Sequence, residues 1–348
     1  MTRIAAVAPV LPEFVHTQAE ITQELAHLVG SDAGKRTVLE RLHSASGIDT
    51  RHTALPLEQY RSLGSFGDTN DVFIRVATDL AERALTDALA AAGLTALDVD
   101  FIMFTSVTGM SAPSIDALLI PRLGLRPDVK RLPSFGLGCV AGASGLARVH
   151  DYLVGHPNEV GVLVSVELCS LTLQRADHTM ANFVATGLFG DGAAAVVLVG
   201  DDRESEGPRI VDTRSAFFPG TGDILGWNIT ANGFEIILTT GIAEVIATSF
   251  PEAIRSFLSD NDLTIADIGC WLAHPGGPRV LDAFGSALGL QRDAFELSWA
   301  SLARVGNLSS SSVLHVLGDA GAQPRGTKGL LFALGPGIGA EFVLLEWP

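Results

Sequence analysis

The chain is poor in cysteine, in positive charge and in long apolar runs. It has 3 cysteines in 348 residues. None forms a Cys-x-x-Cys pair, so neither a disulfide framework nor a structural zinc site is expected. Lysine and arginine number 23 against 39 acidic residues, a net charge of −16. This balance argues against nucleic acid as a partner, because neutralising phosphates needs clustered cations. No purely apolar run is long enough to predict a membrane span.

The first residues do not have the pattern of a secretory signal. Residues 1–9 carry one basic residue and a very short apolar run, which predicts a first strand instead. We therefore expect a cytoplasmic protein, whose reducing surroundings keep its thiols free.

The composition is typical of a large α/β protein with tight turns. Hydrophobic residues make up 47% of the chain, which also has 37 glycines, and this suits a sizeable core. Amphipathic periodicity predicts helices at roughly 72–92, 140–155, 241–259 and 307–319. Short apolar runs predict buried strands at 101–105, 161–166, 193–199, 270–273, 329–333 and 341–346. The alternation of the two patterns indicates α/β layers.

Two parts of the chain resemble each other at a nearly constant offset. The segment LTALD at 94–98 and the segment LTIAD at 263–267 each precede an apolar strand. Cys139 and Asn307, each before a helical pattern, are separated by nearly the same offset. We expect two related halves, 1–205 and 206–348, and a pseudo-twofold axis that brings Cys139 and Asn307 into one site. Chance similarity of short α/β stretches is the alternative.

Cys139 stands in the glycine-rich segment FGLGCVAG, directly before a helical pattern. Small flanking residues allow a tight strand-to-helix turn that presents the thiol at a helix N-terminus. There the helix dipole and a nearby imidazolium are expected to favour the thiolate, which is the nucleophilic form. A buried structural cysteine is the alternative, and it suits Cys169 and Cys270 better because both lie in apolar, strand-like segments.

His274 and Asn307 supply an imidazole and a carboxamide. His274 opens the segment HPGG at the end of an apolar strand, and α/β folds bind ligands at the carboxyl ends of strands. Asn307 stands in the segment GNLSSSS, where a helix N-cap is an equally good interpretation; a turn histidine is the alternative for His274. In the functional interpretation both side chains donate hydrogen bonds to a thioester carbonyl. With a cysteine, they can hold an acyl thioester and condense it with a carbanion.

These motifs, followed by Gly335-Pro336-Gly337, resemble the type III polyketide synthases, the chalcone synthase superfamily of the thiolase fold. The resemblance covers nearly the whole chain and implies a layered αβαβα fold of two pseudo-duplicated halves. It implies that an acyl-CoA starter acylates Cys139, and that His274 and Asn307 hold malonyl-CoA while it loses CO₂. The enolate then attacks the thioester, and the cycle repeats before ring closure. Apart from the CoA thioester substrates, no cofactor and no metal are implied.

The resemblance also assigns a substrate pocket. Phe189 and Phe234 match the family's two gatekeeper phenylalanines, although plain core aromatics would look the same. Further pocket positions correspond to Val107, Ala112, Glu167, Cys169, Thr172 and, on the cyclisation loop, Pro336. Val107 and Ala112 replace a Thr and a Met of the plant enzymes, which makes the wall more apolar or roomier. We therefore expect a fatty-acyl starter and an alkylpyrone or alkylresorcinol product, as in the bacterial enzymes and most of all the mycobacterial alkylpyrone synthases.

The expected CoA contacts depart from the plant pattern. Arg41 matches one of the basic residues around the CoA phosphates, but Val38 and Ala45 stand where lysines are usual. Arg51 is nearby in the sequence, and with Ser309 it completes the expected CoA-binding set. Because two anchors are missing, a starter carried by an acyl-carrier protein stays an alternative.

Three other functions stay open on the sequence alone. A ketoacyl-carrier-protein synthase III would carry out a single condensation and release a linear product. A non-catalytic thiolase-fold subunit would have lost the chemistry of the three motifs. A cysteine hydrolase would need a carboxylate to orient His274, and no motif supplies one. The resemblance also implies a homodimer that buries the surface near 110–113.

Overall fold

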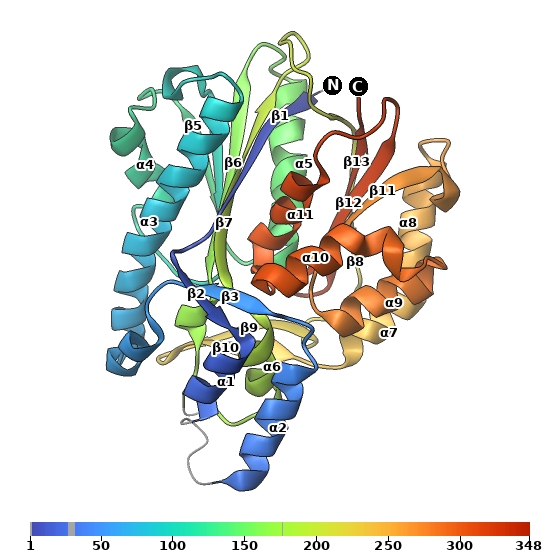
Figure 1. Ribbon diagram of the computed structural model, residues 1–348. Coiled ribbons are helices and arrows are strands. Elements are labelled where there is room, and N and C mark those ends of the chain that lie inside the picture. The colour runs from blue at the N-terminus through green and yellow to red at the C-terminus, as the bar shows by residue number, and fades with distance from the viewer. Residues whose placement is uncertain (1, 27–31, 176) are drawn as a thin grey trace.

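The computed structural model describes residues 2–26, 32–175 and 177–348. Within them, nine strands form one mixed sheet in the order β11-β12-β13-β8-β1-β7-β6-β4-β5 (Figure 1). The strands of this sheet are β1 (Thr2–Val10), β4 (Phe101–Thr105), β5 (Lys130–Ser134), β6 (Val160–Leu168), β7 (Asp191–Val199), β8 (Arg209–Phe217), β11 (Ile268–Ala273), β12 (Lys328–Gly335) and β13 (Gly339–Glu346). Two antiparallel two-stranded sheets lie outside it: one pairs β2 (Phe14–Thr17) with β3 (Thr50–Thr53), and the other is the hairpin of β9 (Leu225–Thr230) and β10 (Gly233–Leu238).

Helices cover both outer faces of the sheet and fill the space between its two halves. They are α1 (Gln18–Ala26), α2 (Ala33–Ser44), α3 (Phe66–Ala91), α4 (Ile115–Leu123), α5 (Ala141–Val154), α6 (Met180–Leu188), α7 (Gly241–Thr248), α8 (Phe250–Ser259), α9 (Pro278–Leu288), α10 (Glu296–Val305) and α11 (Ser312–Ala320). One hydrophobic core joins α3 and α4 to the first half of the sheet, and another joins α7, α8 and α9 to the second half. Between them, α5 and α11 pack together against both inner faces (Figure 1).

The long helix α3 shows how the sequence builds an outer layer. Ser65 caps its N-terminus by accepting a hydrogen bond from the N–H of Asp68, which satisfies one of the otherwise unpaired donors of the first turn. Its buried face carries small residues such as Ala77, Ala81 and Ala84, all fully buried. Alanine favours the helix and lets its axis lie close to the sheet, so α3 can cover β1, β6 and β7 together.

The two halves of the chain are structurally equivalent. The strands β1, β7, β6 and β4 on one side of the β1–β8 junction follow in the same order as β8, β13, β12 and β11 on the other. Thr95 and Thr264 each open a 3₁₀ turn with a capping box, completed by Asp98 and Asp267 respectively. The layers therefore follow the order αβαβα, and the predicted thiolase-like fold of two duplicated halves is confirmed.

The main differences from the predicted elements occur at helix boundaries. The pattern at 241–259 predicts one helix, but the structure has two, α7 and α8, which meet at Ser249 with Pro251 in the first turn of α8. Proline lacks the N–H that would continue the hydrogen-bond ladder and its ring clashes with the preceding turn, so the chain breaks there. The pattern at 307–319 begins five residues too early, since α11 starts at Ser312.

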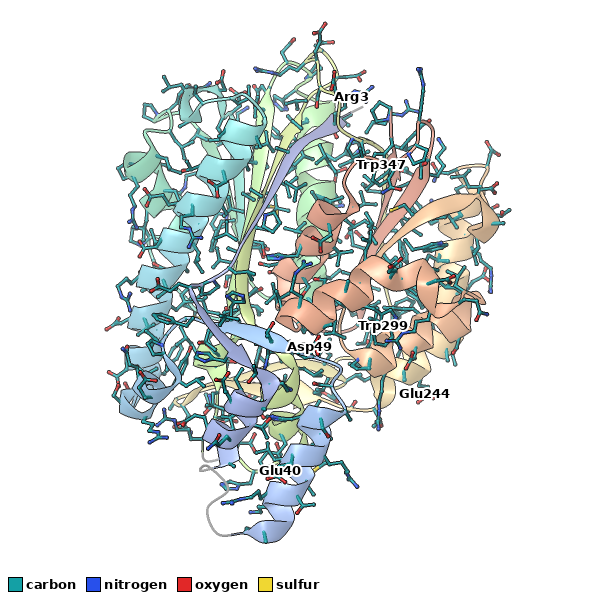
Figure 2. All side chains as sticks on the ribbon, viewed as in Figure 1. Arg3, Glu40, Asp49, Glu244, Trp299 and Trp347 are labelled. Carbon is teal, nitrogen blue, oxygen red and sulfur yellow. The ribbon has the colours of Figure 1, made fainter. Side chains whose placement is uncertain are left out.

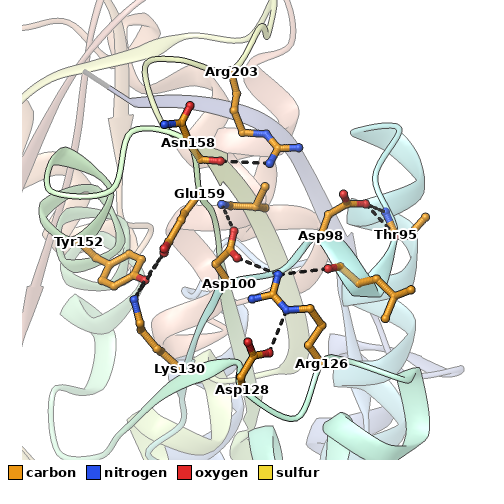
Figure 3. A network of polar contacts seen from close by, with 12 residues as sticks. Thr95, Asp98, Asp100, Arg126, Asp128, Lys130, Tyr152, Asn158, Glu159 and Arg203 are labelled. Carbon is orange, nitrogen blue, oxygen red and sulfur yellow. Dashed lines mark hydrogen bonds and ion pairs between the residues drawn. The ribbon is translucent and has the colours of Figure 1, made fainter.

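A network of ion pairs joins the strand ends that lie farthest from Cys139, His274 and Asn307. Arg126 contacts Asp100 at 2.9 Å and Asp128 at 3.0 Å, and Lys130 donates to Tyr152 at 2.6 Å (Figure 3). These residues lie at or near the N-terminal ends of the parallel strands β4, β5 and β6. Cys139 follows the opposite, carboxyl end of β5, so the network stabilises the sheet without touching the site. Exposed pairs of this kind contribute at most about 1 kcal/mol each.

The predicted homodimer stays a prediction. Met110, on its expected surface, is 41% exposed, and β5 is an edge strand whose residues are largely exposed. Edge strands are commonly covered by partners or protected by charge. Among the described residues, no helix combines the length and apolarity that crossing a bilayer requires. The same residues contain no group of three or more His, Cys, Asp or Glu side chains placed to hold a metal ion.

Gly142 makes the contact between the two halves possible and is open to a direct test. A Cβ atom at this position would lie 2.2 Å from the carbonyl oxygen of Ser310 and 2.9 Å from Val313. We expect Gly142→Ala to lower the free energy of unfolding by about 1–3 kcal/mol, measured by urea denaturation, because the central helices must separate. Gly222→Ala is the control, since nothing lies within 4 Å of its added methyl group. Equal stability of both variants and the wild type would contradict this account.

Candidate active site

Cys139 lies where the chain turns from β5 into the central layer. It occupies a 3₁₀ turn, Gly138–Val140, that leads directly into α5, and its side chain is 9% exposed. Gly138 has φ of +57°, and a Cβ there would lie 2.5 Å from Cδ of Pro336. Only glycine meets both requirements without strain. The predicted turn at the start of a helix is therefore present, and Pro336 packs directly beside it.

Asn307 belongs to the equivalent turn of the second half, but it is not a helix N-cap. Its backbone forms a parallel bridge with Phe189, in which Asn307 N–H donates to Leu188 at 2.8 Å and Gly190 N–H donates to Asn307 at 2.9 Å. Its side-chain oxygen accepts from the N–H of Ser309 at 2.8 Å, and its amide donates to the Gly276 carbonyl at 3.2 Å. One amide N–H of Asn307 is left over for a ligand.

His274 lies at the carboxyl end of β11, as the sequence predicts. Its backbone N–H donates to the Phe332 carbonyl at 2.9 Å, and the residue is 4% exposed. In the part of the chain that the structure describes, neither ring nitrogen has a hydrogen-bond partner. A Cβ on Gly276 would lie 3.6 Å from Nε2 of His274. The glycine that Asn307 holds is thus the glycine next to the imidazole, and the two side chains share one corner.

Ser309 connects Cys139 to this corner. The Cys139 thiol donates to the Ser309 hydroxyl, with 3.6 Å between Sγ and Oγ. Ser309 also has φ of +49°, a conformation that costs a residue with a side chain about 1 kcal/mol or more and is typical of functional sites. It is 3% exposed, and its predicted contact with CoA stays a prediction. One chain of contacts now runs from Cys139 through Ser309 and Asn307 to Gly276 and His274.

The electrostatics of the pair differ from the expectation of a stable thiolate. Burial raises the pKa of the Cys139 thiol to about 12, and it lowers the pKa of the His274 imidazole to about 3. Burial outweighs both the Ser309 hydrogen bond and the helix start, because a lone charge in a dry site loses its hydration. Each group taken alone is therefore favoured in its neutral form.

A cavity of about 360 Å³ reaches Phe189, the bridge partner of Asn307, but its lining, as the described residues form it, does not include Cys139, His274 or Asn307. Three of the predicted pocket residues line it: Cys169, Thr172 and Phe189. Its other walls come from α1, the 3₁₀ helix Leu57–Ser62, α6 and the β9–β10 hairpin. Residues that the sequence did not single out include Ile21, Leu25, Leu57, Tyr60, Ser170, Asn182, Trp227 and Ile236. The walls are mainly apolar, with hydroxyl and amide groups and the charged residues Glu24, Arg51, Arg61 and Arg175 among them, a combination suited to a small organic substrate with polar groups.

The remaining pocket predictions lie outside this cavity's lining. Phe234 is 2% exposed and packs against Phe66 and Trp227, with ring centroids 5.6 and 5.9 Å away. Ala112 is exposed in the single chain. Val107 is buried, and its N–H donates to Glu167 at 3.1 Å.

Glu167 is the centre of a buried hydrogen-bond cluster. It is fully buried on β6, and its carboxylate accepts hydrogen bonds from the hydroxyls of Ser106, Thr108 and Ser310 as well as from the Val107 N–H. Burial raises its pKa above the ordinary value. The cluster joins β4 and β6 to the turn that follows Asn307, so Glu167 supports the site from behind and does not face the described cavity.

The two arginines predicted to bind CoA have different environments. Arg41 lies in the last turn of α2 and is exposed, next to Glu40 at the lower end of the molecule in Figure 2. Arg51 is 4% exposed, and its guanidinium donates to the carbonyls of Thr186 at 2.7 Å and Phe189 at 2.8 Å. The prediction for Arg51 is wrong, because a buried side chain bonded to the backbone cannot reach phosphates in solvent. The prediction was based on the proximity of Arg51 to Arg41 in the sequence, which says nothing about burial.

Comparisons with known proteins agree with this geometry. The sequence profile of the N-terminal domain of chalcone and stilbene synthases matches residues 1–203, and that of the C-terminal domain matches residues 209–347. A 1,3,6,8-tetrahydroxynaphthalene synthase of Streptomyces peucetius subsp. caesius is 52% identical over 99% of this chain and 93% of its own. The alpha-pyrone synthesis polyketide synthase-like Pks18 of Mycobacterium tuberculosis is 30% identical over 99% of this chain and 90% of its own.

The solved structures give the same result. The crystal structure of 1,3,6,8-tetrahydroxynaphthalene synthase from Streptomyces coelicolor, a bacterial type III polyketide synthase, superposes with a TM-score of 0.94. It is 32% identical and covers 99% of both chains. The chain therefore belongs to the chalcone and stilbene synthase family and is a type III polyketide synthase, an acyltransferase that forms carbon–carbon bonds.

Proposed function

We propose that this enzyme condenses malonyl units iteratively on Cys139 and closes the chain to a polyhydroxylated naphthalene. The observation that carries the catalytic part is the continuous chain of contacts from Cys139 through Ser309 and Asn307 to Gly276, beside His274. It supports the roles of Cys139 as nucleophile, His274 as proton acceptor and Asn307 as amide donor at one buried corner. The similarity to the naphthalene synthase of Streptomyces peucetius, at 52% identity, supports the product class.

Loading of the starter begins with proton transfer within the buried pair. The Cys139 thiol gives its proton to His274, so thiolate and imidazolium form together and stabilise each other, whereas either charge alone is unfavourable there. The thiolate attacks the thioester carbonyl of the starter, and the CoA sulfur leaves and takes up a proton. The starter is then bound to Cys139 as a thioester.

Extension uses the same corner for malonyl-CoA. The spare side-chain N–H of Asn307 and the ring N–H of His274 donate to the thioester oxygen of malonyl-CoA. When the bond to CO₂ breaks, its electron pair moves into the enolate, whose negative oxygen these two donors stabilise. The enolate carbon attacks the acyl-Cys139 thioester, and the sulfur of Cys139 leaves. The lengthened chain remains on CoA until it is transferred back to Cys139 for the next extension. A dry site protects the carbanion from protonation.

Carbon counting and the cavity walls support this product class. A naphthalene has ten carbons, and each decarboxylative condensation adds two, so malonyl units alone can supply the whole skeleton. The cavity beside Cys169 carries the polar side chains of Tyr60, Thr172 and Asn182 on otherwise apolar walls. Separate hydroxyl and amide groups suit the regularly spaced carbonyls of a poly-β-keto chain.

A fatty-acyl starter with an alkylpyrone or alkylresorcinol product is the second candidate. The apolar cavity residues Ile21, Leu25 and Leu57 favour it, whereas Ala112 and Val107, from which the fatty-acyl starter was expected, do not line this cavity. The similarity to Pks18, at 30% identity, also supports it. An alkyl tail would occupy the same cavity but would leave its polar groups without partners.

Product analysis separates the two candidates. Purified enzyme is given ¹³C-malonyl-CoA alone, and then with lauroyl-CoA, and the products are identified by mass spectrometry. We expect a fully labelled tetrahydroxynaphthalene from malonyl-CoA alone. Cys139→Ala should give less than about one hundredth of the wild-type product, because the nucleophile is gone.

The other outcomes of the product analysis would indicate a different activity. Products that form only with lauroyl-CoA and contain a labelled ring would favour the alkyl candidate. A single-condensation product that requires an acyl-carrier protein would favour a ketoacyl-carrier-protein synthase. Absence of any new carbon–carbon bond with malonyl-CoA or lauroyl-CoA would contradict both proposals.

The pH dependence of thiol alkylation tests the neutral pair. Because burial holds the pKa of Cys139 at about 12, the thiolate fraction rises with pH throughout the accessible range. We expect the rate of iodoacetamide labelling at Cys139 to rise about tenfold per pH unit between about pH 6 and pH 9. Peptide mapping restricts the signal to Cys139, and burial raises the pKa of Cys169 and Cys270 too. A rate that is already constant above about pH 6 would indicate a preformed ion pair with His274 instead.

Arg41 is the remaining candidate anchor for the CoA phosphates. We expect Arg41→Glu to raise the KM for malonyl-CoA about tenfold with kcat unchanged, because an attractive charge becomes repulsive away from the reacting atoms. Arg255→Glu, on the exposed face of α8, is the control for the change in net charge. If both variants have the same KM, Arg41 does not contact CoA.

A further inference from the structure

Arg51 is a buried cation that catalysis as described does not use. It lies on β3 and is 4% exposed, and one of its terminal nitrogens, Nη1, makes both hydrogen bonds, to Thr186 and Phe189. Among the described residues, its Nε and Nη2 have no hydrogen-bond partner. Burial lowers the pKa of Arg51 to about 10 and the charge of Asp191 acts in the opposite direction, so the guanidinium is still protonated at neutral pH.

The side chain of Arg51 passes between the two backbone segments that meet at the site. A Cβ on Gly306 would lie 3.1 Å from Cγ and Cδ of Arg51, and one on Gly190 would lie 3.6 Å from Cγ. Gly306 directly precedes Asn307, and Gly190 directly follows Phe189. Both glycines therefore leave room for the arginine, and Gly306 also has φ of +74°, which favours glycine.

The carbonyls that Arg51 holds belong to the segment that aligns Asn307. Arg51 binds the carbonyl of Phe189, and Phe189 forms the parallel bridge with Asn307. The hydrogen bonds of this bridge are made by the neighbouring Leu188 and Gly190. One guanidinium thus fixes the last turn of α6, the cavity residue Phe189 and, through the bridge, the backbone of Asn307.

Stability alone is a poor explanation for this arrangement. Burying a charge is costly, and replacing a whole buried ion pair with apolar groups of similar size is often neutral or stabilising, although Arg51 also compensates part of the charge of the buried Asp191. Two of the guanidinium nitrogens lack partners, which adds to the cost. A geometric requirement of the neighbouring site explains why an arginine, with its rigid planar head, stands here.

We propose that Arg51 is a positioning residue that sets the place of Asn307 and Phe189 for decarboxylation of malonyl-CoA. This proposal rests on the proposed function, because it assigns Arg51 to the extension step in which the Asn307 amide stabilises the enolate. Loading of the starter on Cys139 does not need the Asn307 amide. Arg51 therefore affects one half-reaction and not the other, which a general structural role would not do.

The test measures the two half-reactions separately in full-length Arg51→Met. Release of CO₂ from ¹³C-malonyl-CoA reports decarboxylation, and intact-mass spectrometry reports the rate of acylation at Cys139. We expect kcat for decarboxylation to fall about 10- to 100-fold, as small displacements of catalytic groups do, with acylation within about twofold of the wild type. Arg122→Met, an exposed arginine paired with Asp79 and Glu82, is the control and should leave both rates unchanged.

The outcomes keep this proposal separate from the proposed function. If the wild type neither decarboxylates malonyl-CoA nor acylates Cys139, the proposed function is wrong. If the wild type does both and Arg51→Met decarboxylates within about twofold of it, or loses both rates equally while folded, the role of Arg51 is wrong. If Arg51→Met does not fold, Arg51→Lys decides. Its flexible ammonium cannot reproduce the fixed geometry, so an unchanged decarboxylation rate would overturn the proposal.

Discussion

The structure depends on one close contact, where the first turns of two equivalent helices meet at the centre of the molecule. Gly142, at the start of α5, lies directly against the carbonyl of Ser310 before α11. No side chain fits between them, so the two helix starts come together. Cys139 and Ser309 lie in these turns, and the thiol of one half reaches the hydroxyl of the other. The packing of the duplicated halves therefore brings Cys139 and Ser309 together.

The same packing decides the electrostatics. Helices buried on all sides exclude water, and burial raises the pKa of Cys139 and lowers that of His274. A dry site that makes isolated charges unfavourable also strengthens the electrostatic interactions between paired charges and with charges that form during the reaction. The shifted pKa values of Cys139 and His274 and the buried amide donor of Asn307 are thus two results of one cause. Glu167 shows the alternative solution, since its buried carboxylate is surrounded by hydroxyl donors within the described structure.

The sequence predicted the catalytic corner well because each member ends a recognisable pattern. Cys139 and Asn307 stand at equivalent offsets, and His274 ends an apolar strand, so periodicity and duplication indicated that they meet. The roles assigned to them came from the motifs and from the resemblance to the family. The prediction for Arg51 failed because an arginine in the sequence does not reveal its burial. The positions assigned to Phe234 and Ala112 depended on aligning single residues with the family, which cannot show which side of a wall a side chain faces.

The cavity was the least predictable part, and its construction explains why. Its walls include Ile21 and Leu25 from α1, Tyr60 from a 3₁₀ helix, and Trp227 and Ile236 from the β9–β10 hairpin. These elements lie outside the nine-stranded sheet, and no internal repeat or strong periodicity marks them. The catalytic corner, in contrast, is built from the central helices and strand ends that the duplication fixes.

The cavity walls and the corner of Cys139, His274 and Asn307 are thus built by different parts of the fold. Substitutions in the peripheral elements can reshape the cavity without moving Cys139, His274 or Asn307, because the two sets of residues belong to different layers. Relatives named for a naphthalene product and for an alpha-pyrone product both align with nearly the whole of this chain. Arg51 is an exception to the division, since it lines the cavity and also holds the backbone that carries Asn307. Changes in the cavity near it should therefore alter catalysis and product together, whereas changes around Ile21 or Ile236 should alter product alone.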